Sequence, residues 1–393
     1  MKWPSWIQID LDSIAHNLAQ IKQHTKAEIC PILKGDGYGH GAPVLSAFLQ
    51  TQGVNIIGVS DLEEALAILD VHPITILLLT PPLDSQLETI LQYKIISTVT
   101  SEKTIVSLGE LSTKRRQYAA VHLKVDTGLN RLGASLSEAL HLADLIKKYP
   151  YMRLKGVFTH FAAAFKDQSL TERQFQKFKE LQTAFYKQGW SDLVWHAANS
   201  AALVTAPATH LDLVRIGTLL FGQSPVPLDS SWDLENTWSF HTRLIQVRQV
   251  QAGTGVGYGH SYHTKEQTTI GVIPVGYGDG LDLDPISTPA RQLRHAIGRI
   301  LRRHQAAVYV NGTPAPIIGR IGMGLTSIDL SLVPNPTVGQ EVIVPMRRVT
   351  CSRRIPKVYI QTDRIVCIWW ENKAYAKGRR IPSLRGIFQS ALH

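Results

Sequence analysis

The chain has 393 residues, of which 44% are hydrophobic and 18% charged, and its formal net charge is +10. This length favours two domains, and the composition is that of a soluble globular protein and excludes extensive disorder. The longest apolar runs, such as "ITILLLT" at 74–80, are too short to cross a bilayer. Because the first residues also lack the apolar stretch of a signal peptide, we expect no membrane span and a cytoplasmic location.

Cysteines and charges exclude further classes of protein. Cys30, Cys351 and Cys367 have no spacing typical of metal ligands, so we expect reduced thiols and no metal site. From Glu341 onward the chain has eleven Lys and Arg against three Asp and Glu, which makes a basic tail. The aromatic spacing of RNA-binding sheets and the usual DNA-binding motifs are absent, so we expect a solvated tail and no nucleic-acid partner.

The first 222 residues alternate short aliphatic runs with amphipathic stretches. One such stretch is "DLEEALAILD", for which Asp61 is a plausible N-cap, and another is "SLSEALHLADLIKKYP", closed by Pro150. The eight predicted strands are "EICPILK", "NIIGVS", "ITILLLT", "IISTVT", "AAVHLKV", "LKGVFTH", "DLVWHAA" and "LDLVRIG". Eight alternations of strand and helix predict an α/β fold of the TIM type, a (β/α)8 barrel with functional groups at the carboxyl ends of its strands.

The alternation of aliphatic runs and amphipathic stretches ends after Gly222. A linker, "QSPVPLDSSWDLEN", leads into short strands separated by Gly and Pro turns, among them "TTIGVIPVGYGDG" and "QEVIVP". We therefore predict a barrel domain over residues 1–235 and a mostly β domain with the basic tail over residues 236–393.

Polar residues stand at the ends of five predicted strands. Lys34 ends the first strand, Arg131 follows the fifth, His160 ends the sixth, "HAANS" ends the seventh, and Arg215 with Gly217 closes the eighth. For any single one, a cap, a turn residue or a hydrogen-bonded buried histidine is the ordinary interpretation. Five such placements together favour a site at one end of the barrel.

A lysine in this position can be a surface ion-pair partner, a phosphate ligand or an amine that traps a carbonyl. The loops after the last two strands offer small hydroxyls and backbone N–H groups to a phosphate, at Asn199, Ser200, Gly217 and Thr218. An amine beside a phosphate site indicates pyridoxal 5′-phosphate, and Arg215 is a residue that could face the ring nitrogen of this cofactor.

Eight sequence blocks carry a more specific likeness. In order they are "PILKGDGYGHG", "KVDTGLNRLG", "THF", "HAANSAA", "VRIGTLLFG", "GVGYGHSY", "PVGYGDGL" and "GRIGMG". Together they resemble the signature blocks of the alanine racemase family, from about residue 5 to residue 360. The resemblance implies a pyridoxal-phosphate barrel with a C-terminal β domain, a homodimer, and interconversion of L- and D-alanine for peptidoglycan.

The resemblance also implies two catalytic bases. Lys34 matches the lysine that holds the cofactor and acts as the base toward D-alanine. Tyr258 matches the tyrosine base on the opposite face of the substrate, which the other subunit donates. Racemisation removes the α-proton from one face and returns a proton to the other, so the reaction needs a pair of this kind.

Further roles follow from the same matches. The residues that match cofactor-binding positions are Lys34, Tyr38, His160, Asn199, Ser200, Arg215, Gly217 and Thr218, with His160 supporting Arg215. Arg131 and Met323 match the positions that receive the substrate carboxylate. Lys124 matches a supporting lysine that is carbamylated in many family members. His196, Tyr277 and Arg320 match other positions that support the site or line its entrance. The chain departs from the family at Gly324 and Leu325, where an Asp-Gln pair is usual.

Three alternatives stay open at this point. Gly324 could widen the entrance, as in an amino-acid racemase of broader specificity. A pyridoxal-phosphate decarboxylase of the same architecture is disfavoured by Arg215, because decarboxylation needs the stronger electron sink that an acidic partner provides. A non-catalytic pyridoxal-phosphate-binding protein is disfavoured by the β domain and Tyr258.

Overall fold

The computed structural model describes residues 3–282, 307–376, 379–381, 384 and 388. It divides into two compact units, one formed by residues 11–237 with 382–393 and the other by residues 1–10 with 238–381. The two units are described separately below.

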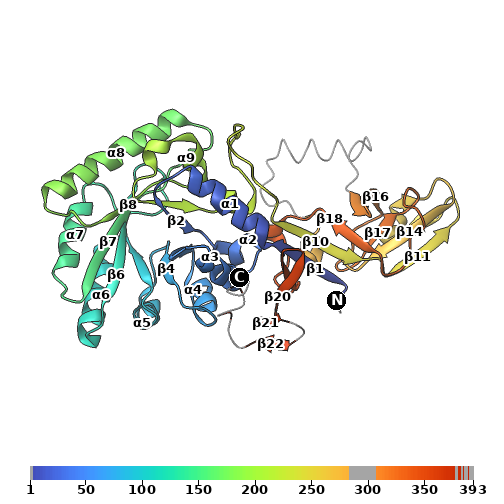
Figure 1. The fold of residues 1–393 in the computed structure, drawn as a ribbon, viewed down its shortest axis with the longest axis horizontal. Helices are drawn as coiled ribbons and strands as arrows, with labels where there is room; N and C mark the ends of the chain where they lie inside the picture. The colour runs from blue at the N-terminus through green and yellow to red at the C-terminus, as the bar shows by residue number, and fades with distance from the viewer. Residues whose placement is uncertain (1–2, 283–306, 377–378, 382–383, 385–387, 389–393) are drawn as a thin grey trace. The chain divides into compact units, whose positions relative to one another are not determined.

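The first unit contains parallel strands with helices around them (Figure 1). The strands are β2 Glu28–Pro31, β3 Ile56–Val59, β4 Thr75–Leu78, β5 Ile96–Val99, β6 Ala119–Lys124, β7 Met152–Phe158, β8 Val194–His196 and β9 Leu213–Ile216. Strands β3 to β8 pair in sequence order, and β2 pairs with β9. Parallel bridges between Ile32 and Gly58 and between Asn199 and Arg215 join these two sheets into a closed ring. The predicted (β/α)8 barrel and all eight of its strands are confirmed.

Helices follow the strands, as the sequence pattern predicts. They are α1 Leu11–Gln23, α2 Lys34–Tyr38, α3 Ala42–Thr51, α4 Leu62–Leu69, α5 Leu87–Gln92, α6 Glu102–Arg115, α7 Ala139–Lys147, α8 Gln168–Lys187 and α9 Ser200–Thr205, with short 3-10 turns η1 Asp84–Gln86, η2 Pro207–Thr209 and η3 Thr218–Phe221. Asp61 caps α4, its side chain accepting a hydrogen bond from the Glu64 N–H at 2.9 Å. Helix α7 begins four residues later than the amphipathic stretch from Ser135 indicates. Within the described residues, no helix combines the length and the apolar character that a bilayer crossing requires.

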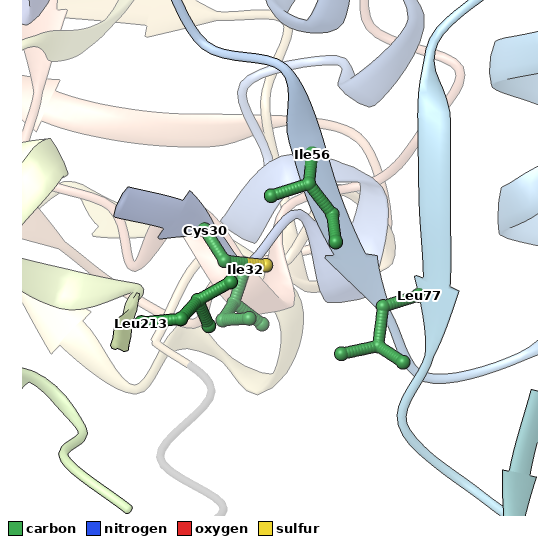
Figure 2. Packing of buried hydrophobic residues seen from close by; sticks show 5 residues of the cluster. All are labelled: Cys30, Ile32, Ile56, Leu77 and Leu213. Atoms are coloured by element: carbon green, nitrogen blue, oxygen red, sulfur yellow. The ribbon is translucent and has the colours of Figure 1, made fainter. Parts of the chain in front are cut away.

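Aliphatic side chains fill part of the barrel. Figure 2 shows Cys30, Ile56, Leu77 and Leu213, from strands β2, β3, β4 and β9, gathered with Ile32, which follows β2. All five are at most 8% exposed. Strands that are buried on both faces carry nearly continuous aliphatic runs, which explains why the sequence alone locates them.

The second unit is mostly β structure. Its strands are β1 Ser5–Asp10, β10 Trp238–Arg243, β11 Gln246–Val250, β12 Gly255–Val256, β13 Tyr262–His263, β14 Thr268–Ile273, β15 Ala307–Val310, β16 Thr313–Ile318, β17 Thr326–Asp329, β18 Glu341–Val344, β19 Lys357–Gln361, β20 Arg364–Trp370, β21 Lys373–Ala376 and β22 Arg379–Ile381. The unit also contains the turns η4 Tyr258–His260, η5 Tyr277–Asp279 and η6 Arg348–Thr350. In the described part of the chain, twelve strands form one sheet in the order β11-β14-β17-β16-β15-β18-β10-β1-β19-β20-β21-β22.

Strand β1 pairs with two strands that come much later in the chain. It runs antiparallel to β10 and parallel to β19, with Ile7 opposite both Phe240 and Lys357. The first ten residues therefore belong to the β-rich unit, whereas the sequence rhythm assigned residues 1–235 to the barrel. The reason is that a pairing across more than 200 residues leaves no local signature. Within the basic tail, residues 377–378, 382–383, 385–387 and 389–393 lie outside the described residues.

Candidate active site

Lys34 opens an unusual turn just beyond β2. The strand itself ends at Pro31, so Lys34 lies three residues past the strand end rather than on it. The next four residues, Gly35, Asp36, Gly37 and Tyr38, all have positive φ, between 54° and 64°. A run of left-handed residues is costly unless glycine supplies part of it, which accounts for the glycines that follow Lys34.

Glu64 of α4 holds this turn. One carboxylate oxygen, Oε1, accepts hydrogen bonds from the N–H groups of Gly35 at 2.5 Å and Asp36 at 3.4 Å. The other, Oε2, accepts from the N–H and hydroxyl of Ser60, each at 3.1 Å. Glu64 is nearly buried, at 9% exposure. It thus fixes the backbone that presents the amine of Lys34, although the sequence patterns did not single it out.

Arg215 of β9 is buried at 4% exposure and makes a defined set of hydrogen bonds. Its NH1 donates to Nδ1 of His196 at 2.8 Å. Its NH2 donates to the carbonyl oxygens of Thr159 at 2.7 Å and Ala197 at 3.0 Å, and lies 3.4 Å from Nδ1 of His160. None of these contacts uses the Nε–H, which leaves this donor without an acceptor among the described residues.

Positive charge dominates this end of the barrel. Burial is the main cause that lowers the pKa of Lys34, and the charge of Arg131 lowers it further. Burial likewise lowers the pKa of Lys124 from 10.5 to about 7, assisted by the charges of Arg215 and Arg131. The Nζ atom of Lys124 lies 4.4 Å from the centre of the Phe158 ring. Burial and Arg215 also lower the pKa of His160, to about 2, so this imidazole is neutral.

The loops after β8 and β9 meet the turn at Tyr38. The Gly217 N–H donates to Oγ of Ser200 at 3.0 Å. A Cβ atom at Gly217 would lie 2.5 Å from the Tyr38 hydroxyl, so a larger residue there would displace the Tyr38 ring. Asn199 caps α9 by accepting from the Ala202 N–H, and Thr218 begins η3 directly after Gly217. These predicted phosphate-binding residues therefore lie together.

Four predicted site residues belong to the β-rich unit. Tyr258 is 77% exposed, in a turn between Gly257 and Gly259, and a Cβ added to Gly257 would come within 3.4 Å of the Arg320 backbone. Met323 is 69% exposed, and its carbonyl oxygen accepts from the Gly278 N–H, next to Tyr277. The segment from Arg320 to Met323 therefore brings these four residues to neighbouring loops.

The predicted site residues thus form two groups, one in each unit. The barrel group contains Lys34, Tyr38, Lys124, Arg131, His160, His196, Asn199, Ser200, Arg215, Gly217 and Thr218, and the β-rich group contains Tyr258, Tyr277, Arg320 and Met323. Sequence patterns missed Glu64 and also His122, whose Nδ1 lies 2.9 Å from Nε2 of His196. A buried glutamate on a helix and an inward histidine on a strand have ordinary structural interpretations, so no local signal marks them.

Comparison with known proteins agrees with this arrangement. Residues 9–225 match the family model for the alanine racemase N-terminal domain, and residues 237–365 match that for its C-terminal domain. An alanine racemase of Desulfovibrio desulfuricans is 33% identical over 388 residues, covering 91% of this chain and 98% of that protein. One from Desulfosudis oleivorans is 36% identical over 360 residues, covering 86% of this chain and 87% of that protein.

Solved structures give the same result. An alanine racemase of Clostridium difficile 630 superposes with a TM-score of 0.86 at 26% identity, covering 94% of this chain and 99% of that one. The alanine racemase of Bacillus anthracis with bound L-Ala-P gives a TM-score of 0.80 at 25% identity, with coverage of 94% and 98%.

The parallel barrel, the β-rich unit and the relatives and structures named above together define a two-domain amino-acid isomerase. The chain belongs to the alanine racemase family. The resemblance seen in the eight sequence blocks is therefore confirmed.

Proposed function

We propose that this protein uses pyridoxal 5′-phosphate to interconvert L-alanine and D-alanine, and that its D-alanine serves peptidoglycan synthesis. The observations that carry the proposal are an amine of lowered pKa, Lys34, and a buried Arg215 whose Nε–H donates to no acceptor among the described residues. The curated relatives that this chain matches over 98% and 87% of their length are named alanine racemases.

The residues of the barrel group fit this cofactor. Lys34 supplies an amine that can form a covalent link to an aldehyde. The Nε–H of Arg215 suits an aromatic ring nitrogen, and the hydroxyls of Tyr38 and Ser200, which lie beside Gly217, suit a phosphate. When bound, the cofactor would withdraw electrons from the α-carbon of the amino acid and so make its proton acidic.

Lys34 would move the proton on one face of the α-carbon. An ordinary lysine is almost entirely protonated at neutral pH, and a base must be neutral to accept a proton. Burial, together with the charge of Arg131, increases the neutral fraction of Lys34 by lowering its pKa. Tyr258 of the partner subunit would serve the opposite face, which makes the homodimer part of the proposal.

The remaining residues would bind and orient. Arg215 keeps its proton near neutral pH, because its pKa is lowered by burial only to about 10. It would therefore donate a hydrogen bond to the ring nitrogen without transferring a proton to it. Arg131 is exposed and could pair with the substrate carboxylate together with Met323, while Tyr277 and Arg320 would narrow the entrance.

A racemisation assay tests the proposal. Purified protein is incubated with L-alanine, with and without added pyridoxal 5′-phosphate, and D-alanine is measured by chiral chromatography. We expect D-alanine to form and the rate to rise with cofactor until it saturates. Failure to produce D-alanine from cofactor-loaded protein would overturn the proposal, and release of carbon dioxide would indicate the decarboxylase instead.

One observation favours a broader range of substrates. A Cβ added to Gly324 meets no atom within 4 Å, so the missing side chain leaves open space beside Met323. Turnover of alanine, serine, lysine and arginine by the wild type and by Gly324→Asp would test this. A wider range in the wild type, narrowed by the substitution, supports the broader racemase, and equal profiles contradict it.

A further inference from the structure

Three buried polar side chains from β6, β8 and β9 form a chain of hydrogen bonds. His122 Nδ1 lies 2.9 Å from His196 Nε2, and His196 Nδ1 lies 2.8 Å from Arg215 NH1. The three residues are 2%, 0% and 4% exposed. Polar groups buried to this degree are costly unless their hydrogen bonds are satisfied, so the direction of each bond matters.

Arginine sets the direction of the whole chain because a guanidinium can only donate. His196 must accept at Nδ1, and as a neutral ring it then carries its proton at Nε2. That N–H donates to Nδ1 of His122, which in turn must be unprotonated. Burial, together with Arg215, holds the pKa of His196 well below 6.5 and that of His122 at about 3, so both rings are neutral.

The strand geometry is adapted to receive the His122 ring. The register between β6 and β7 shifts at this point, where Val121 pairs with Leu154 and His122 pairs with Gly156, skipping Lys155. A Cβ at Gly156 would lie 2.8 Å from Cε1 and 2.9 Å from Nδ1 of His122. The irregularity and the glycine together make room for the imidazole.

His196 is restrained on its other side as well. Its ring stacks on Phe158 with 4.7 Å between centroids and an interplanar angle of 11°. Without an acceptor at its Nε2 position, the buried ring would lose a hydrogen bond or take the other tautomer. The other tautomer places an N–H against the NH1 donor of Arg215, which removes one hydrogen bond that fixes the guanidinium.

We propose that His122 is a positioning residue for Arg215, because it holds His196 in the one tautomer that accepts a hydrogen bond from the guanidinium. The effect of this positioning on racemisation rests on the proposed function, because it requires Arg215 to contact the cofactor. The tautomer itself is a property of the protein and can be measured without reference to activity.

Ring nitrogen-15 NMR of the full-length protein labelled at histidine tests the tautomer directly. The wild type is compared with His122→Phe, which removes the acceptor, with Gly156→Ala, which displaces the ring, and with the control His141→Phe at an exposed site. We expect His196 to be protonated at Nε2 and not at Nδ1 in the wild type and the control. In His122→Phe and Gly156→Ala we expect a population protonated at Nδ1. Protonation of Nδ1 in the wild type, or identical His196 signals in all folded variants, would overturn the inference.

Kinetics separate the positioning from the role of Arg215. For His122→Phe we expect kcat for racemisation about tenfold lower with KM for L-alanine within about twofold, and partial recovery in His122→Asn, which restores an acceptor. A changed tautomer with unchanged kcat would uphold the positioning by His122 and contradict the proposed role of Arg215. Loss of kcat with an unchanged tautomer would overturn the inference, because His122 would then act by another route.

Discussion

Replacing Glu64 by Gln is expected to loosen the left-handed turn that presents Lys34. Both carboxylate oxygens accept from backbone N–H groups, Oε1 from Gly35 and Oε2 from Ser60. Glutamine has only one side-chain oxygen, so its NH2 group must face one of these donors. At least one hydrogen bond is then lost, and a donor is placed against a donor.

The expected size of the effect follows from the turn itself. Asp36 and Tyr38 are non-glycine residues with φ of 55° and 54°, and such residues cost about 1–2 kcal/mol each. A hydrogen bond to a charged group contributes about 1.5–3 kcal/mol, so the bonds to Glu64 offset much of this strain. Allowing for water that can reach the turn, we expect its opening free energy to fall by about 2–4 kcal/mol.

Hydrogen–deuterium exchange of peptides that cover residues 33–41 measures this change. A fall of that size corresponds to roughly 30- to 900-fold faster exchange in the turn, with little change in the distant helix α8. The neighbouring exposed residue provides the matched control, Glu63→Gln. Equal exchange in the two variants would refute the idea that Glu64 holds the turn.

Three further predictions concern the site. Borohydride reduction of the yellow, cofactor-loaded protein should attach the label to Lys34, and a peptide map with the label on another lysine would contradict this role. Lys34→Ala and Tyr258→Phe should each be nearly inactive. Refolding the two variants together should recover roughly a quarter of wild-type activity, since about half the dimers are mixed and each mixed dimer has one intact site. A mixture as inactive as its parents would argue against shared sites. Because burial lowers the pKa of Lys124 from 10.5 to about 7, the unfolded chain binds more protons between these values. Stability should therefore rise with pH across this window in buffer free of carbon dioxide, and Lys124→Met should remove that part of the rise in a thermal-unfolding series.

The sequence predicted the barrel well because its strands are buried on both faces. Runs such as "ITILLLT" need no partner to be recognised, and the residue after each run falls at the same end of the barrel. This regularity is why Lys34 and Arg215 could be assigned to one site before any geometry was known. Lys34 was misplaced by three residues, since the strand ends at Pro31 and a turn follows.

The features that the sequence could not predict depend on contacts between segments that are far apart in the chain. His122 matters only because β6 and β7 shift their register beside Gly156, and no local pattern encodes a register shift. Glu64 looks like a residue of an amphipathic helix, and its role depends on the backbone of a turn 29 residues earlier. The place of β1 in the distant sheet is hidden for the same reason.

The position of β1 between β10 and β19 has a consequence for synthesis of the chain on the ribosome. Residues 5–10 are made long before their parallel partner, β19, which ends at Gln361. At about 5–20 residues per second, roughly 20 to 70 seconds separate the two strands. During that interval both edges of β1 are open to unintended pairing until β10, and then β19, emerge. The β-rich unit is thus begun before the barrel and completed after it. A separately produced fragment that starts at Trp238 would lack the strand that lies between β10 and β19.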